Sequence, residues 1–267
     1  MEHTQAKWGQ RAPRILVFDS GLGGLTVFRA IHALLPGADY LYLADDARFP
    51  YGALEPDDLI AGVLSVIAEA EAGFRADCIV IACNTASTLV LPALRAVYAA
   101  PIVGTVPAIK PAAAASQSGF ISVLATPGTV SRDYTAELIR DFASGVDVTL
   151  VGSHILAGFA ERALRGELIA DGDILAEIAP CFVSRGGMRT DHVVLACTHY
   201  PLLLARFERL APWPVTWVDP APAIARRVAH ILGRAAPGIG RLDARSTKPD
   251  ADTALLSVMT GILAVWG

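Results

Sequence analysis

The sequence predicts an α/β protein built from two related units, each with a mainly parallel sheet. Short apolar runs rich in Val, Ile and Leu show no polar alternation, which is typical of parallel strands covered on both faces. These runs alternate with longer helical segments, and the order strand, loop, helix recurs at a spacing near 106–114 residues. The 267 residues are 53% hydrophobic and 18% charged, enough for one large core or two of ordinary size.

The first round of the pattern begins after a polar N-terminal tail. Strands are expected at 14–18, 40–44 and 80–82, and each is followed by a helix, at about 25–35, 58–74 and 84–98. Polar residues follow each strand directly, and in parallel sheets ligands bind beyond the carboxyl ends of the strands. We therefore look for a site among the residues that follow these strands.

The second round is expected to begin near residue 101. Its strands are placed at 120–124, 146–151 and 193–196, and its helices at about 131–143, 154–165 and 170–184. A further strand at 215–218 and a helix to about 232 are expected to return to the first unit. The predicted domains are 14–99 plus 213–267 and 100–212, with residues 1–13 as a tail and 235–250 as a surface loop.

Composition narrows the classes of function. The net charge is −4, and no basic run interleaved with aromatic residues predicts nucleic-acid binding. Residues 1–13 lack the apolar stretch of a signal peptide, and the uncharged residues 253–267 are too few to span a membrane. Four cysteines and six scattered histidines give neither metal-site spacing nor a disulfide framework. We expect a soluble cytoplasmic protein without a metal.

Two cysteines share the same surroundings, 114 residues apart. Cys83 and Cys197 each follow an apolar run and an alanine, and each precedes small polar residues and a helix start. The free N–H groups and dipole of a helix N-terminus favour a thiolate. Cys78 and Cys181 lack this context and are expected to be small buried hydrophobes. Two thiols facing one site predict acid/base chemistry, in which one removes a proton from a stereocentre and the other returns one to the opposite face.

Other polar residues near these cysteines allow two interpretations. Asp19 and His199 would tune the pKa of Cys83 and Cys197 if they lie beside them, but Asp19 also fits an ordinary turn. The glycines of 21–24 form a weak nucleotide signal, because the spacing of a dinucleotide or P-loop motif is missing. Spacing alone places Glu161 on a solvated helix face.

Five motifs in order carry a family resemblance. They are residues 18–25 (FDSGLGGL), 50–52 (PYG), 82–86 (ACNTA), 124–129 (LATPGT) and 196–202 (ACTHYPL). On these motifs the chain, from about residue 15 to residue 228, resembles the cofactor-independent glutamate racemases of the aspartate/glutamate racemase superfamily.

The resemblance implies a function and a set of site residues. It implies interconversion of L- and D-glutamate without a cofactor, in a cleft between the two units of a homodimer subunit, supplying D-glutamate for peptidoglycan. The thiols of Cys83 and Cys197 would exchange the proton, with Asp19 assisting the first and His199 and Glu161 the second. The residues that would hold the substrate are Asp19, Ser20, Tyr51, Gly52, Asn84, Thr85, Thr126, Thr129, Thr198 and His199.

Two departures and three alternatives accompany this interpretation. Asp46 stands where the family commonly has Ser, and Ser153-His154 where it often has Cys-Pro, which makes Glu161 the weakest of the carried-over residues. The alternatives are a racemase of aspartate or a related acid, a non-catalytic amino-acid-binding or regulatory protein, and a thiol hydrolase. A hydrolase needs only one cysteine, so it would leave the second unexplained.

Overall fold

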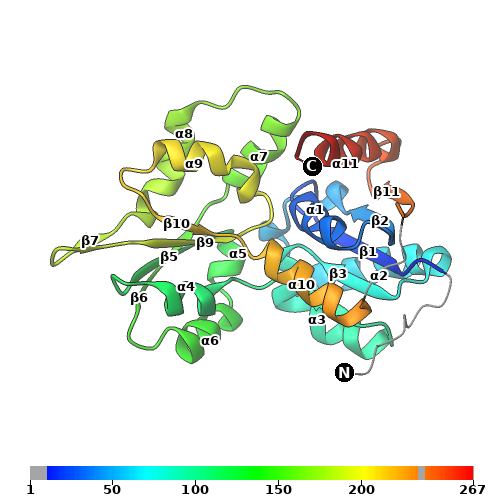
Figure 1. Ribbon diagram of the computed structural model, residues 1–267, viewed down its shortest axis with the longest axis horizontal. Coiled ribbons are helices and arrows are strands. Elements are labelled where there is room, and N and C mark those ends of the chain that lie inside the picture. Colours follow the sequence, from blue (N-terminus) through cyan, green and yellow to red (C-terminus); the bar gives the residue numbers. More distant parts are fainter. Residues whose placement is uncertain (1–10, 234–237, 267) are drawn as a thin grey trace. The chain divides into compact units, whose positions relative to one another are not determined.

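The computed structural model describes residues 11–233 and 238–266 and confirms the predicted fold class (Figure 1). The chain forms two compact units, here called unit 1 (residues 1–105 and 221–267) and unit 2 (residues 106–220). Each unit contains a parallel sheet with helices packed on it. Most of the predicted N-terminal tail falls on residues 1–10, outside the described residues.

Unit 1 is built on a five-stranded sheet in the order β11-β2-β1-β3-β4. Its strands are β1 (Arg14–Asp19), β2 (Asp39–Ala44), β3 (Cys78–Ile81), β4 (Ile102–Gly104) and β11 (Leu242–Ser246). Every pair of neighbouring strands is parallel. The central strand β1 therefore receives hydrogen bonds from both sides.

Helices cover both faces of this sheet, as the uninterrupted apolar strands predict. The helices are α1 (Leu25–Leu34), α2 (Pro56–Phe74), α3 (Asn84–Val97), α10 (Ala221–Leu232) and α11 (Asp252–Trp266). Ile15 and Val17 pack with α1, α10 and α11, while Leu16 and Phe18 pack with α2 and α3. All four side chains are fully buried, and each contributes about 1.5–3 kcal/mol on transfer from water.

Unit 2 contains a four-stranded parallel sheet in the order β10-β9-β5-β6. Its strands are β5 (Phe120–Ala125), β6 (Asp147–Gly152), β9 (His192–Ala196) and β10 (Thr216–Val218). Its helices are α4 (Ile109–Ala115), α5 (Pro127–Val130), α6 (Asp133–Phe142), α7 (Leu156–Leu164), α8 (Asp171–Ile178) and α9 (Leu204–Leu210). The helix expected at about 170–184 ends at Ile178. A small antiparallel hairpin of β7 (Ser184–Arg185) and β8 (Met188–Arg189) follows it. The α4 and α6 helices share an apolar cluster with Ile121, Val123 and Val194.

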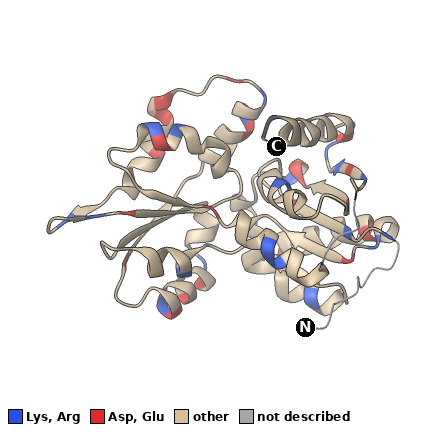
Figure 2. Cartoon of the chain, in the orientation of Figure 1, with Lys and Arg blue, Asp and Glu red and all other residues tan. Residues whose placement is uncertain are grey.

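Three strands differ from the sequence expectation. Residues 102–104 pair with β3 in unit 1, and β10 pairs with β9 in unit 2, so the division lies near residues 105 and 220. In both cases a helix connects two parallel strands of one sheet, which is the usual crossover connection. The expected loop at 235–250 contains β11, an edge strand of the sheet that carries the charged residues Asp243 and Arg245. Figure 2 shows charged residues of both signs in the region of this strand.

Residues 11–233 and 238–266 contain neither a helix suited to crossing a membrane nor a cluster suited to a metal ion. No helix there combines the length and hydropathy that crossing a bilayer requires. In the same residues, no group of three or more His, Cys, Asp or Glu side chains has a geometry that could hold a metal ion.

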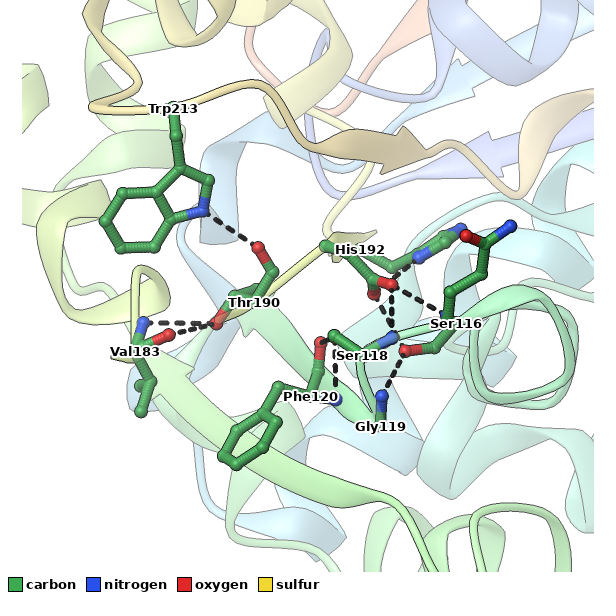
Figure 3. A network of polar contacts seen from close by, with 10 residues as sticks. Ser116, Ser118, Gly119, Phe120, Val183, Thr190, His192 and Trp213 are labelled. Atoms are coloured by element: carbon green, nitrogen blue, oxygen red, sulfur yellow. Dashed lines mark hydrogen bonds and ion pairs between the residues drawn. The ribbon is translucent and has the colours of Figure 1, made fainter. Parts of the chain in front are cut away.

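A polar network fastens the amino-terminal end of the unit 2 sheet (Figure 3). The Asp191 carboxylate accepts hydrogen bonds from Ser116 Oγ at 2.8 Å and from the N–H groups of Gln117 and Ser118 at 2.8 and 2.9 Å. It also contacts His192 Nδ1 at 2.7 Å. Burial alone would raise the pKa of Asp191, but these hydrogen bonds outweigh it and hold the pKa well below its usual range.

We expect Asp191→Asn to destabilise the protein by about 1–3 kcal/mol at pH 7, because an amide cannot replace both acceptor oxygens. The folded pKa lies below the unfolded value, so this stabilisation is complete above about pH 4 and is lost as the pH falls further. Urea unfolding should therefore show a stability gap between the two proteins that is constant from pH 7 to about pH 4 and narrows as the pH falls from about 4 towards 2. The exposed Asp141→Asn on α6 serves as a control. A stability gap that stays constant between about pH 4 and pH 2 would contradict the assignment.

Candidate active site

Three neighbouring strands of unit 1 end at the same edge of the sheet with polar residues. In the parallel register Asp19 lies beside Ala44 and Phe18 lies beside Ile81. The residues that end or follow these strands, Asp19, Asp45 and Cys83, are therefore brought to one edge. The Asp45 N–H donates to the Asp19 carbonyl oxygen at 2.9 Å, which ties two of the strand ends together.

Cys83 occupies the N-cap position of α3. Its sulfur accepts a hydrogen bond from the Ala86 N–H at 3.5 Å and lies 3.7 Å from Ser20 Oγ. The side chain is buried, with 5% of the residue exposed. A helix N-terminus stabilises negative charge, so this position favours the thiolate over the thiol.

The turn that follows β1 fixes the side chain of Asp19 at the end of that strand. Its Oδ1 accepts the Gly21 N–H at 2.9 Å, and the Tyr42 hydroxyl donates to the Gly21 carbonyl at 2.8 Å. A Cβ at Gly24 would lie 2.5 Å from the Asp19 Cβ and 2.8 Å from the Tyr42 hydroxyl. Glycine is therefore required where α1 begins, because a side chain would displace Asp19.

Asn84 and Ser87, in the first turn of α3, differ sharply in their contacts. Ser87 Oγ donates to the Ile81 carbonyl at 3.1 Å and accepts the Thr105 N–H at 3.0 Å, which fixes α3 to two strands. Asn84 is 2% exposed, yet neither polar atom of its amide has a hydrogen-bond partner within the described residues. Buried polar groups are nearly always satisfied, so this amide is available for a ligand. Thr85, the next residue, is also buried.

The loop after β2 brings Tyr51 to the same cluster. Tyr51 packs with Phe18 and Cys83, and its hydroxyl donates to the Asp45 carboxylate. Burial and the neighbouring negative charge of Asp45 raise the pKa of Tyr51 well above its usual value, so its hydroxyl remains a donor. Gly52, next in the loop, is exposed.

In unit 2 the second cysteine begins a chain of polar contacts. Cys197 Sγ lies 3.8 Å from His199 Nδ1, and His199 Nε2 lies 3.1 Å from Glu161 Oε1. The second Glu161 oxygen, Oε2, accepts Arg165 Nη2 at 2.6 Å. His199 and Glu161 are 2% and 3% exposed. Glu161 is therefore not the solvated residue that helical spacing indicates but a buried partner of His199.

Ser153 explains how Glu161 is placed. Its Oγ accepts the N–H groups of Ile155 and Leu156 at 3.3 and 3.0 Å, and so caps the start of α7, on which Glu161 lies. At the departure Ser153-His154, the serine thus supplies a hydroxyl acceptor for the N–H groups at this helix start. Arg165, four residues after Glu161, was missed because a charged pair at this spacing is common on solvated helix faces.

Small hydroxyl side chains gather at the carboxyl edge of the unit 2 sheet. Ala125 pairs with Ala196, so the residues that follow, Thr126 and Cys197, end neighbouring strands. The hydroxyl oxygens of Thr126 and Thr129 are 3.1 Å apart. Thr129 and Thr198 are buried, and Thr126 is partly buried.

The other two cysteines have no such setting. Burial raises the pKa of the Cys78 thiol to about 12 and that of the Cys181 thiol to about 12. Both side chains are fully buried, and they remain neutral thiols at physiological pH. Each unit therefore holds one inert cysteine in its interior and one cysteine at the carboxyl edge of its sheet. Only the edge cysteines have the partners that proton transfer needs.

The chain is similar to known racemases in sequence. The family model for Asp/Glu/Hydantoin racemases matches residues 15–228. Glutamate racemase of Brucella ovis is 56% identical over 219 residues, which cover 82% of this chain and 79% of that protein.

Solved structures extend the similarity over nearly the whole chain. Escherichia coli glutamate racemase, in complex with L-glutamate and the activator UDP-MurNAc-ala, has a TM-score of 0.83 at 37% identity and covers 96% of both chains. Glutamate racemase from Thermus thermophilus, in complex with β-chloro-D-alanine, has a TM-score of 0.72 at 30% identity and covers 93% of both chains. The chain belongs to the Asp/Glu/Hydantoin racemase family, and it is an isomerase that racemises an amino acid.

Proposed function

We propose that this racemase interconverts L- and D-glutamate without a cofactor, using Cys83 and Cys197 as its acid and base. The observation that carries the proposal is the repetition of one arrangement in both units. In each, a buried cysteine follows the end of a parallel strand and has a hydrogen-bonding partner beside its sulfur. A reaction that runs equally in both directions through opposite faces of one carbon is served by two equivalent groups. Catalysis by a single nucleophilic thiol would give no role to the second cysteine.

In the proposed mechanism both thiols reach one α-carbon from opposite faces. The thiolate on one face takes the α-proton and becomes a thiol, and the electron pair left on the α-carbon is delocalised into the α-carboxylate. The thiol on the other face then donates its proton to that carbon and becomes a thiolate. The product has the opposite configuration, and the reverse reaction begins from the protonation states that the forward reaction leaves.

The neighbouring polar groups assist each thiol differently. His199, held by Glu161, contacts the sulfur of Cys197 and would accept or return its proton. Asp19 ends the strand beside Cys83 and would support the exchange there together with the α3 N-terminus. The Glu161 carboxylate orients the imidazole, which leaves Nδ1 to face the sulfur.

The substrate carboxylates and ammonium would be held by small polar groups. We propose Asp19, Ser20, Tyr51, Gly52, Asn84 and Thr85 in unit 1, and Thr126, Thr129, Thr198 and His199 in unit 2. The orphan amide of Asn84 supports this assignment, because it offers one acceptor and two donors without a protein partner among the described residues. Glutamate is proposed as substrate because the curated relatives are glutamate racemases and one similar structure contains L-glutamate.

The proposal extends to where the enzyme acts, to its oligomeric state and to the use of its product. We infer that the enzyme acts in the cytoplasm as a homodimer and supplies D-glutamate for peptidoglycan, as the family resemblance implies. Growth of a D-glutamate auxotroph carrying this gene, and the mass of the purified protein in solution, would test these points.

We expect Cys83→Ser and Cys197→Ser each to lower the kcat/KM for glutamate racemisation by at least about 10²- to 10⁴-fold, the usual contribution of a positioned acid or base. Each variant should still exchange the α-proton of one enantiomer with solvent, and the two variants should act on opposite enantiomers. Circular dichroism measures racemisation, and NMR in D₂O measures exchange.

Cys78→Ala and Cys181→Ala are the matched controls and should retain racemisation, because neither thiol ionises at neutral pH. A Cys→Ser variant at position 83 or 197 with the wild-type racemisation rate would refute the two-thiol mechanism. Racemisation of aspartate in preference to glutamate would instead change the substrate and leave the mechanism standing.

Asn84→Ala should raise the KM for glutamate roughly 10- to 150-fold, equivalent to about 1.5–3 kcal/mol for a hydrogen bond to a charged group. Stability should be unchanged, because the amide has no partner to lose among the described residues. Ser87→Ala should instead lower the stability, because it removes the two hydrogen bonds that Ser87 Oγ makes to Ile81 and Thr105. Steady-state kinetics and thermal unfolding separate the two effects. An Asn84→Ala protein with unchanged KM would remove this residue from the binding site.

A further inference from the structure

We propose that Arg48, seated against Gly62 of α2, is a positioning residue for the Tyr51–Gly52 part of the active site and acts through Asp45. The inference rests on the function proposed above and adds to it three residues outside the predicted site, Asp45, Arg48 and Gly62. It is carried by three contacts within unit 1, involving a buried carboxylate, its counter-charge and the helix surface that receives it.

The buried carboxylate is Asp45, which follows β2 at the edge where Asp19 and Cys83 lie. Its side chain is 1% exposed. One oxygen, Oδ2, accepts the Tyr51 hydroxyl and lies 2.7 Å from Arg48 Nη2, while Oδ1 is buried and has no partner among the described residues. A buried carboxylate is strongly unfavourable without a counter-charge. Arg48 is the cation that the described residues place within ion-pair distance of it.

Gly62 is the surface on which the Arg48 guanidinium lies. A Cβ built at Gly62 would be 1.3 Å from Arg48 Nη1 and 2.4 Å from its Cζ. Glycine is unfavourable in the middle of a helix, and α2 continues for a dozen residues beyond this one, to Phe74. The space that Gly62 leaves is therefore what allows the guanidinium to reach Asp45.

The same loop is fastened on its other side by Ser246, the last residue of β11, and by the residues that follow it. Ser246 Oγ donates to Asp46 at 2.6 Å, and the Ala47 N–H donates to Thr247 Oγ at 3.0 Å. Lys248 Nζ lies 3.5 Å from Asp46. These contacts hold the exposed side of the loop, whereas Asp45 holds its buried side. Arg48 thus determines whether Tyr51 keeps the hydroxyl contact that fixes it beside Cys83.

Gly62→Ala tests the proposal without removing any group of the loop. The added methyl displaces the guanidinium, which is the flexible end of its side chain, so the fold should be retained. We expect the KM for both glutamate enantiomers to rise about tenfold while kcat changes less than about threefold, the signature of lost binding rather than lost chemistry. Amide hydrogen exchange across residues 45–52 should accelerate in the same variant.

Gly73→Ala is the matched control. It lies on the same helix, and a Cβ there meets nothing within 4 Å. Its kinetics and the exchange of residues 45–52 should match those of the wild type.

A double-mutant cycle shows whether Gly62 acts through Arg48. Arg48→Met should raise KM and loosen the loop as Gly62→Ala does, and adding Gly62→Ala to it should produce no further change. Arg48→Lys should recover part of the loss, because it restores a positive charge near Asp45.

Unchanged loop exchange and KM in Gly62→Ala, or equal effects of Gly62→Ala with and without Arg48, would overturn the proposal. Different measurements test the proposed function and the proposed positioning role of Arg48. A wild-type protein inactive on glutamate would refute the proposed substrate, and the hydrogen-exchange comparison of Gly62→Ala with Gly73→Ala would still decide the role of Arg48.

Discussion

Parallel hydrogen bonding fixes where the polar side chains of each unit lie. Because β1 pairs in register with β2 and β3, the residues that end or follow these strands meet at one edge of the unit 1 sheet. The register of β5 with β9 does the same for Thr126 and Cys197 in unit 2. A shift of one residue would turn alternate apolar side chains out of two packed clusters, so core packing and site geometry are set together.

The two candidate thiols occupy corresponding positions, each after the end of a parallel strand of its own unit, but their sulfur atoms contact different groups. Cys83 is stabilised by the N-terminus of α3 and lies near Ser20, whereas Cys197 contacts an imidazole held by a buried carboxylate. In the proposed mechanism the two thiols must be equivalent in function but not in surroundings, because each acts both as an acid and as a base. The proposed positioning role of Arg48 adds a third element, since it holds the loop that packs Tyr51 beside Cys83.

The fold class and most elements could be predicted from the sequence, because doubly covered strands leave an apolar pattern that depends only on local composition. The strands β4 and β10 lie in the other unit from the one that the sequence predicts, because local composition does not show which sheet a strand joins. The partnership of Glu161 with His199 and the seat of Arg48 on Gly62 depend on contacts between distant residues. No local pattern separates a charged helix residue that faces solvent from one that faces a buried histidine.

The most direct test of the two-thiol account is the isotope content of both enantiomers during racemisation of L-glutamate in D₂O. Early in the reaction, the account predicts that D-glutamate carries solvent deuterium at its α-carbon while the remaining L-glutamate stays protiated. Two separate acid/base groups require this outcome, because the proton removed and the deuteron added belong to different thiols. D-glutamate that retains the original α-proton would show that a single group transfers it and would contradict the account.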